Sequence, residues 1–451
     1  MSLRFGTDGV RGVANAELTP ELAVALGRAA VASIGPGRWY VARDTRRSGP
    51  LLAAALSAGL ASEGAEVVDV GVLPTPGVAH LSREDGVAAA MISASHNAFG
   101  DNGIKFFGPG GRKLDDATEA ALEAHLSRLE QEGIPGTARR PVGDDVGIVG
   151  RDASMAERYA VHLQRTSIEG RKLTGLRVVL DCSNGAASIV GPHVLTALGA
   201  DVTVINAEPD GSNINAGCGS NHPESLQQVV TTRRADVGLA LDGDADRLIA
   251  VDAQGQVVDG DHVIAICAID RHERGVLPAD TVVVTVMTNL GFRQAMAAHG
   301  IKVVETDVGD RSVLEAMELG GYTLGGEQSG HVIFSELAST GDGVLTGIQL
   351  LDVMARSGRP LSDLAAVMSR LPQVLRNVKV ARRDAAIVER LRQDIAMAEL
   401  ELAGEGRVLV RPSGTEPLVR VMVEAPTAEQ ASNVADRLVA AVERLSGEPS
   451  P

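Results

Sequence analysis

The sequence predicts an α/β protein, with three related mixed-sheet α/β domains followed by a smaller C-terminal α+β domain. A unit of strand, polar loop, helical segment and second strand occurs three times, each time with a glycine just before the second strand. Towards the C-terminus this unit gives way to two strands, joined by a turn and followed by one helix. Such a repeat indicates three domains of one kind and a last domain of another kind.

The three copies of the unit begin with the segments WYVARDTRRSG, RVVLDCSNGAAS and TVVVTVMTNLGF. Their second strands lie in residues 63–71, 198–206 and 299–307. The strands are apolar on both faces, and a helical segment of roughly 10–15 residues separates them, which is typical of a parallel crossover in a covered sheet.

The last domain is predicted from GRVLVRPSGTEPLVRVMVEA, a strand–turn–strand pattern, and TAEQASNVADRLVAAVERL, a helix with a threonine cap. Segments rich in glycine and proline mark the boundaries between domains. We therefore expect domains at residues 1–150, 151–253, 254–369 and 370–451.

The composition excludes several classes of protein. A formal net charge of −16 argues against binding nucleic acid, because a phosphate backbone needs a positive surface. The three cysteines, Cys182, Cys218 and Cys267, have no C-x-x-C spacing, which indicates a reducing compartment. The sequence shows no signal peptide and no apolar run of about 18 residues, so we expect a cytoplasmic protein that does not bind membranes.

The first loop with more functional groups than a turn requires is ISASHN, after the apolar run GVAAAMI. It contains Ser95 and His96, and Lys105 follows on the next strand. The end of a buried strand is where α/β sheets place ligand sites. A serine there can form a covalent phosphoryl intermediate that a nearby cation balances. The alternative is a purely structural loop; no G-x-S-x-G segment marks Ser95 as a hydrolase nucleophile.

The second loop, ALDGDADRL, places Asp242, Asp244 and Asp246 at alternate positions. Their mutual repulsion favours a bound hard cation such as Mg²⁺, with a solvated acidic turn as the alternative. An EF-hand is excluded, because Arg247 and Ala253 stand where its glycine and glutamate are needed. An aspartyl-phosphate enzyme with Asp242 as nucleophile is a rival reading, but the threonine or valine expected after its D-x-D-x core is absent.

The third loop is GGEQSGH, residues 325–331, whose glycines permit close backbone approach. Glu327 and Ser329 are suited to hydrogen bonds with adjacent sugar hydroxyls, and His331 is suited to proton transfer. Glycine-rich loops with a glutamate also occur without any such role.

The fourth loop is RPSGTEPLVR, residues 411–420. Two guanidinium groups, two hydroxyls and backbone N–H groups surround its glycine turn, which suits an anion such as phosphate, with an ordinary hairpin as the alternative. The residues of this loop are Arg411, Ser413, Gly414, Thr415 and Arg420. Together the four loops supply a nucleophile, a metal site, sugar-binding groups and a phosphate site, one in each domain.

Seven segments, in this order, resemble the α-D-phosphohexomutase superfamily over essentially the whole chain. They are FGTDGVRG (5–12), RDTRRSG (43–49), ISASHNAFGDNGIKFF (92–107), NINAGCGS (213–220), DGDADR (242–247), GGEQSGH (325–331) and RPSGTEPLVRVMVE (411–424). Gln328 and the CGS stretch resemble the branch that acts on glucosamine phosphates, since the mannose and glucose branches often carry methionine in place of Gln328. Ala98 departs from the family, which usually has proline after S-H-N.

The resemblance implies four domains around a central cleft and an isomerase that interconverts glucosamine 6-phosphate and glucosamine 1-phosphate. It implies that Ser95 is the phosphoserine and that one Mg²⁺ per subunit lies between Ser95, Asp242, Asp244 and Asp246. The intermediate would be glucosamine 1,6-bisphosphate, and the product would supply UDP-N-acetylglucosamine and peptidoglycan precursors.

The resemblance also assigns roles to the remaining polar residues. Arg247 and Lys105 are expected to stabilise charge, and His331 and Lys105 to transfer protons. Arg11 is expected among the catalytic residues, and His96 and His222 among the substrate-binding residues, with Arg11 and His222 lining the cleft near the phosphoserine. Glu327 and Ser329 are expected on the sugar hydroxyls. The fourth loop is expected to hold the distal phosphate.

Three alternatives remain open. They are a sister mutase acting on mannose or glucose phosphates, a non-catalytic sugar-phosphate sensor, and a phosphatase. The only expected partner is the phosphosugar. A homodimer is compatible with the sequence, which does not determine the oligomeric state.

Overall fold

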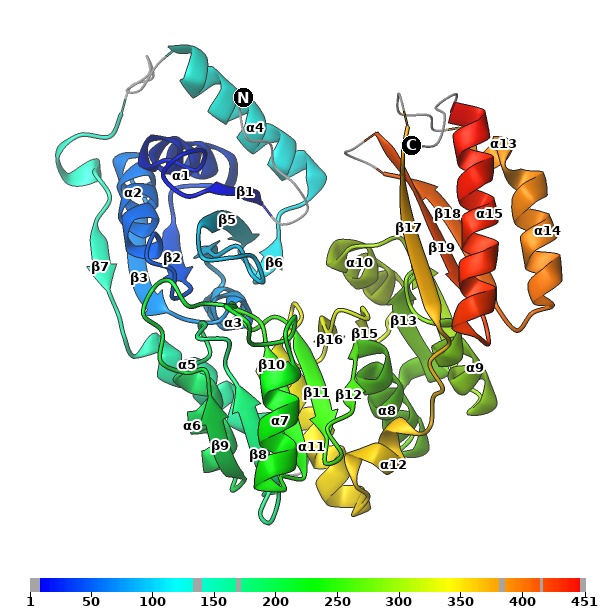
Figure 1. Ribbon diagram of the computed structural model, residues 1–451. Helices are drawn as coiled ribbons and strands as arrows, with labels where there is room; N and C mark the ends of the chain where they lie inside the picture. Colours follow the sequence, from blue (N-terminus) through cyan, green and yellow to red (C-terminus); the bar gives the residue numbers. More distant parts are fainter. Residues whose placement is uncertain (1–8, 133–139, 168–171, 381–385, 414–416, 447–451) are drawn as a thin grey trace. The chain divides into compact units, whose positions relative to one another are not determined.

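The computed structural model describes residues 9–132, 140–167, 172–380, 386–413 and 417–446 (Figure 1). These residues form two compact units. The first unit combines residues 1–287 with 301–366, and the second combines residues 288–300 with 367–451. The first unit contains three sheets and the second contains one.

The first sheet has the strand order β1-β5-β4-β2-β3-β7, with β6 paired to β5. Strand β2 runs parallel to β3 and β4, whereas β5 is antiparallel to β4. The strands are β1 (Val10–Val13), β2 (Arg38–Arg43), β3 (Glu66–Val72), β4 (Ala88–Ile92), β5 (Asp101–Gly108), β6 (Arg112–Lys113) and β7 (Val149–Arg151).

Both faces of this sheet are covered, as the apolar strands predict. Trp39 of β2 packs in the core formed with the helices α1 and α2, and it meets Phe106 edge to face. The next residue, Tyr40, points to the opposite face and donates a hydrogen bond to Asp85 of α3. The helices are α1 (Pro20–Ile34), α2 (Gly49–Ser62), α3 (Thr75–Asp85) and α4 (Asp116–Glu132).

The second sheet has the order β12-β11-β10-β8-β9. Strand β8 is parallel to β9 and β10, and β11 is antiparallel to β10. Its strands are β8 (Arg177–Asp181), β9 (Asp201–Ile205), β10 (Val237–Leu241), β11 (Leu248–Asp252) and β12 (Val257–Val258). The accompanying helices are α5 (Met155–Arg165), α6 (Val190–Ala197) and α7 (Glu224–Arg233).

The third sheet has the order β14-β13-β15-β16. Strand β13 is parallel to β14 and β15, and the edge strand β16 is antiparallel to β15. Its strands are β13 (Thr281–Thr285), β14 (Lys302–Thr306), β15 (Leu324–Gly326) and β16 (Val332–Phe334). The helices of the first unit in this part of the chain are α8 (Gly260–Glu273), α10 (Asp310–Gly320), α11 (Gly343–Ser357) and α12 (Leu361–Ala365). The three predicted crossovers are thus confirmed as β2–β3, β8–β9 and β13–β14.

The second unit has an antiparallel sheet of order β17-β19-β18. It consists of β17 (Gln373–Lys379), β18 (Arg407–Pro412) and β19 (Leu418–Glu424), with helices α9 (Leu290–Ala298), α13 (Ile387–Arg390), α14 (Arg392–Leu402) and α15 (Ala428–Ser446). The predicted threonine cap is present, since Thr427 Oγ1 accepts a hydrogen bond from Gln430 N. The predicted fold class, three α/β domains and a smaller α+β domain, is confirmed.

No helix in the described part of the chain combines the length and the apolarity needed to cross a bilayer.

Glycines set the distance between α1 and α2. A Cβ added to Gly59 would lie 2.3 Å from the carbonyl oxygen of Val24, and one added to Gly27 would lie 2.5 Å from that of Leu56. Both distances are below contact, so the helices pack backbone to backbone at this crossing.

We predict that Gly59→Ala lowers the melting temperature. Alanine gains about 1 kcal/mol of helix propensity, but overpacking a rigid backbone contact costs about 1–3 kcal/mol. Gly37→Ala is the matched control, because nothing lies within 4 Å of its added Cβ. Calorimetric melting of the three proteins decides between the two effects, and a melting temperature raised by Gly59→Ala would contradict the close packing.

Candidate active site

The three polar loops of the first unit occupy the same position in their sheets. Each joins a strand that has a parallel neighbour on one side to the antiparallel strand on its other side. The loops lie between β4 and β5, between β10 and β11, and between β15 and β16. Repetition of one sheet order therefore places Ser95, the aspartates and the Glu327–His331 segment at equivalent turns.

Ser95 lies at the end of β4 and is only 1 % exposed. Its backbone is in the left-handed region, with φ of 50°. Its Oγ donates a hydrogen bond of 2.6 Å to Asp242 Oδ2, and it lies 3.3 Å from Nδ1 of His96. The hydroxyl of the first loop thus directly contacts a carboxylate of the second.

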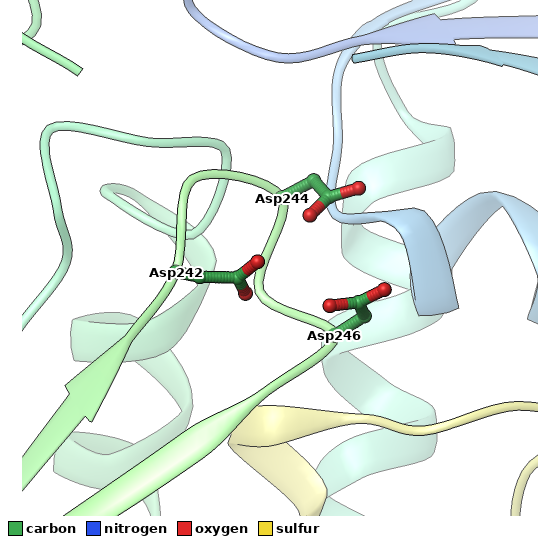
Figure 2. A group of neighbouring side chains, drawn as sticks. All are labelled: Asp242, Asp244 and Asp246. Atoms are coloured by element: carbon green, nitrogen blue, oxygen red, sulfur yellow. The ribbon is translucent and has the colours of Figure 1, made fainter. Parts of the chain in front are cut away.

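The carboxylates of Asp242, Asp244 and Asp246 face a common space at the β10–β11 turn (Figure 2). One oxygen of each lies within 4.8 Å of one oxygen of each of the others, and all three residues are buried. Ala245, with φ of 57°, turns the chain between the second and third aspartate. Gly243 is required for the approach of the two loops, since a Cβ there would lie 2.7 Å from the carbonyl oxygen of Ser95.

Asp244 is held through one of its two oxygens. Its Oδ2 accepts hydrogen bonds from Thr75 Oγ1 at 2.6 Å and from Lys105 Nζ at 3.1 Å. Its Oδ1 and the Oδ1 of Asp246 are buried and have no hydrogen-bond partner among the described residues. In a cation site, the carboxylate oxygens that bind the ion are buried and accept no hydrogen bond from the protein. The three aspartates are therefore able to hold a metal ion.

The electrostatics of the cluster are uneven. Burial raises the pKa of Asp242 well above its usual value, and the charges of Asp246 and Asp244 raise it further. Burial also raises the pKa of Asp244, but Lys105 and the hydrogen bond from Thr75 outweigh this effect and lower it below the usual value. A cation between the carboxylates would relieve the repulsion that acts on Asp242.

His331 closes the cluster from the third loop. Its Nε2 accepts a hydrogen bond from the backbone N–H of Gly341 at 3.1 Å, so Nε2 carries no proton. Its Nδ1 lies 3.7 Å from Asp246 Oδ2. In this tautomer His331 presents an N–H group to Asp246, while Asp310 Oδ2 lies 3.7 Å from its Nε2.

The other polar groups of the third loop are partly satisfied. Glu327 accepts a hydrogen bond from Gly309 N at 3.1 Å. Burial opposes the charged form of Arg247, but the carboxylates of Asp246, Asp242 and, to a lesser extent, Glu327 raise the pKa of its guanidinium. In the described part of the chain, Ser329 Oγ and Gln328 Nε2 are buried without hydrogen-bond partners. These atoms remain available to a polar ligand.

Of the residues expected around Ser95, His96 lies next to it, with its Nδ1 3.3 Å from Ser95 Oγ. Burial lowers the pKa of His96, and the positive charges of Arg247 and Arg11 lower it further. His222 is exposed, and its backbone N–H closes a turn with Gly219. The role predicted for His222 stays a prediction.

The fourth loop belongs to the second unit. Arg411 of β18 and Arg420 of β19 are cross-strand partners, so their side chains emerge on one face of the hairpin. The backbone N–H of Ser413 donates to Leu418 O at 2.9 Å, and Ser413 is buried. Gly414 and Thr415 lie outside the described residues.

Sequence reasoning missed Thr75, which fixes Asp244 from the first residue of α3. The threonine stands in the segment LPTPG, where the prolines indicate only a helix start. Its side chain meets a carboxylate 169 positions away, so no local pattern reveals the contact.

Models of one family match the chain in four consecutive segments. They describe the α/β/α domains I, II and III and the C-terminal domain of phosphoglucomutase/phosphomannomutase, and they match residues 2–133, 157–255, 259–371 and 375–441.

Curated relatives cover nearly the full chain. A phosphoglucosamine mutase of Symbiobacterium thermophilum is 55% identical over 94% of this chain and 95% of its own length. That of Mycolicibacterium paratuberculosis is 52% identical over 98% and 99%.

Solved structures share the fold. A phosphoglucomutase/phosphomannomutase family protein of Burkholderia thailandensis gives a TM-score of 0.82 at 24% identity, covering 99% of this chain and 98% of its own. N-acetylphosphoglucosamine mutase of Aspergillus fumigatus, solved with GlcNAc-6P and magnesium, gives 0.67 at 18% identity, covering 99% and 96%. The chain therefore belongs to the phosphoglucomutase/phosphomannomutase family of phosphohexomutases, in its phosphoglucosamine mutase branch.

Proposed function

We propose that the chain interconverts glucosamine 6-phosphate and glucosamine 1-phosphate through a phosphoserine at Ser95. The observation that carries the proposal is the buried Ser95 hydroxyl, 2.6 Å from Asp242 within a trio of carboxylates. A serine in this setting is suited to carry a phosphoryl group beside a divalent cation. The glucosamine substrate is supported by relatives 51–55% identical that are phosphoglucosamine mutases.

The reaction consists of two phosphoryl transfers. In the first, the bond between Ser95 Oγ and phosphorus breaks, a bond from phosphorus to O1 of glucosamine 6-phosphate forms, and the O1 proton passes to a base. The product is glucosamine 1,6-bisphosphate. After the sugar has turned round, its O6–phosphorus bond breaks, Ser95 Oγ takes the phosphoryl group, and O6 regains a proton.

We infer that Asp242, Asp244 and Asp246 hold Mg²⁺, with a phosphate oxygen on Ser95 as a further ligand. Hard carboxylate oxygens suit this ion, and magnesium is named in the Aspergillus fumigatus structure. When bound, the ion would neutralise charge on the transferred phosphoryl group.

The neighbouring residues stabilise negative charge and transfer protons. Lys105 lies 3.1 Å from Asp244 and 3.9 Å from Asp246, so it balances carboxylate charge beside the phosphorylated serine. Arg247 has a buried Nε without a hydrogen-bond partner among the described residues, and it is suited to an equatorial phosphate oxygen. His331 holds its proton at Nδ1 and serves as a donor, with Lys105 as the other candidate for proton transfer.

Sugar and distal phosphate are assigned to the remaining two loops. Glu327 and the unpartnered Ser329 hydroxyl hold sugar hydroxyls that occupy similar places in both orientations. Arg411 and Arg420, on one face of their hairpin, hold the phosphate that is not being transferred, together with Ser413, Gly414 and Thr415. Because the two guanidinium groups recognise an anion, they serve either phosphate.

Ser95→Ala is predicted to abolish turnover while the fold is retained. Alanine removes the oxygen proposed to carry the phosphoryl group, together with its contacts to Asp242 and His96. A coupled assay with glucosamine 1-phosphate and catalytic glucose 1,6-bisphosphate, and the melting temperature, measure the two effects. Ser33→Ala is the control, since Ser33 Oγ bonds only within its own helix to Ala29 O at 2.9 Å. Substantial mutase activity in a folded Ser95→Ala protein would refute the nucleophile assignment.

A panel of sugar 1-phosphates tests the substrate. We expect kcat/KM to be highest for glucosamine 1-phosphate and lower for glucose and mannose 1-phosphates in one coupled assay. A highest value for mannose or glucose would assign the chain to a sister activity. Release of inorganic phosphate as the main outcome would indicate a phosphatase, and binding without turnover would indicate a sensor.

A further inference from the structure

Arg46 is one of the most completely buried arginines of the described chain, with an exposed fraction of 1 %. It follows β2 in the segment RDTRRSG, for which the site described above has no use. A guanidinium group removed from water costs several kcal/mol unless its donors are paired. The acceptors of its N–H groups therefore indicate why it is there.

All five N–H donors of the guanidinium have a partner. Nε donates to the carboxylate of Asp44 at 2.8 Å. The other four bonds go to backbone carbonyl oxygens of one short segment, the loop that contains Ser95. These acceptors are Ser95 O at 3.0 Å, Asn97 O at 2.8 Å, Asp101 O at 3.0 Å and Ala98 O.

Because no donor remains, Arg46 has none to offer a phosphate or a sugar. This distinguishes it from the arginines assigned to charge stabilisation, such as Arg247, whose Nε lies 3.8 Å from Asp246 Oδ1 and makes no hydrogen bond among the described residues. The guanidinium of Arg46 instead donates its hydrogen bonds mainly to the backbone of the loop that surrounds it.

A second chain of hydrogen bonds holds the same loop from its other end. Asp44 Oδ2 accepts a hydrogen bond from Ser93 Oγ at 2.7 Å, and Ser93 Oγ accepts one from Ser95 N at 2.9 Å. Asn215, from the second sheet's domain, donates to Ser95 O at 2.8 Å. The N–H of Ser95 is thus fixed by the buried Ser93, and its carbonyl by the buried Arg46 and the half-buried Asn215.

These bonds matter because of the backbone conformation of Ser95. A non-glycine residue in the left-handed region costs about 1–2 kcal/mol. Glycine would remove this cost, but it would also remove the hydroxyl. The conformation directs Oγ towards Asp242, so the surroundings must stabilise it.

We propose that Arg46 is a positioning residue for phosphoryl transfer: it organises residues 95–101 around its guanidinium and so keeps Ser95 Oγ aimed at the carboxylate trio. This inference rests on the proposed function of Ser95. Lysine can replace Arg46 only in part, because an ammonium group has three donors and no planar fork.

The test compares Arg46→Met with Arg28→Met. Methionine removes the donors and keeps much of the side-chain length. Arg28 is similarly buried in the same domain, at 3 % exposure, and pairs with Glu63 at the end of α2. Arg28→Met therefore measures how much stability is lost when a buried arginine away from the Ser95 loop is removed.

For Arg46→Met we expect kcat to fall about 100-fold, the effect of a misplaced reacting group, with KM nearly unchanged because Arg46 contacts no substrate. Uptake of phosphate by Ser95 from glucose 1,6-bisphosphate, followed by intact mass, should slow in parallel. Backbone amide exchange in residues 93–102 should accelerate. Arg28→Met should lower the melting temperature and leave kcat and the exchange of this segment at wild-type values.

Wild-type kcat and loop exchange in Arg46→Met would overturn the proposal, and so would an equal loss of kcat in Arg28→Met or an effect confined to KM. Arg46→Lys keeps the positive charge in the event that the methionine variant does not fold. It should give the same pattern in weaker form, and a wild-type kcat in it would count against the proposal. Absence of mutase turnover in the wild-type protein would contradict the proposed function, while loop exchange would still test the positioning role.

Discussion

Three carboxylates gathered at one buried turn impose the constraint on which the rest of the site depends. Two like charges 4 Å apart repel by about 4 kcal/mol at the effective dielectric constant of a partly buried site. Lys105 and the Thr75 hydroxyl offset this for Asp244, whereas burial and repulsion raise the pKa of Asp242. A phosphoryl group on Ser95 would add further negative charge beside Asp242, so the charged state of the site requires a cation as well as Lys105 and Arg247.

One topological position carries three groups of candidate site residues. In each α/β domain of the first unit, the turn into the antiparallel strand carries one group: the serine after β4, the aspartates after β10, and the Glu327–His331 segment after β15. Duplication of a sheet thus supplies three equivalent turns, and contacts between them bring the serine, the carboxylates and His331 together. Glycine at position 243 keeps the first two turns within bonding distance.

The features of this arrangement that depend on neighbouring residues in the chain could be predicted from the sequence. Those that depend on contacts between residues distant in the chain could not. Buried strands that end in polar loops predicted Ser95, the three aspartates and His331 as candidate site residues, and the structure brings these side chains together. The repeated glycine predicted the crossovers. Thr75, Arg46 and Asn215 were not identified as contributors, because each acts on residues distant in the chain, two of them through backbone carbonyl oxygens that have no sequence pattern. The placement of α9 was not predicted from the sequence for the same reason. This helix lies between β13 and β14 in sequence but belongs to the second unit.

Titration of the protein with Mn²⁺, followed by electron paramagnetic resonance, tests the central claim most directly. We expect one bound ion per chain in the wild type and binding weaker by at least about 10–100-fold in Asp244→Asn. Asp252→Asn should bind like the wild type, since Asp252 Oδ1 only accepts backbone N–H groups of Gln254 and Gln256. A wild-type protein that binds no ion, or an Asp244→Asn protein that binds it equally well, would contradict a cation site at the carboxylate trio.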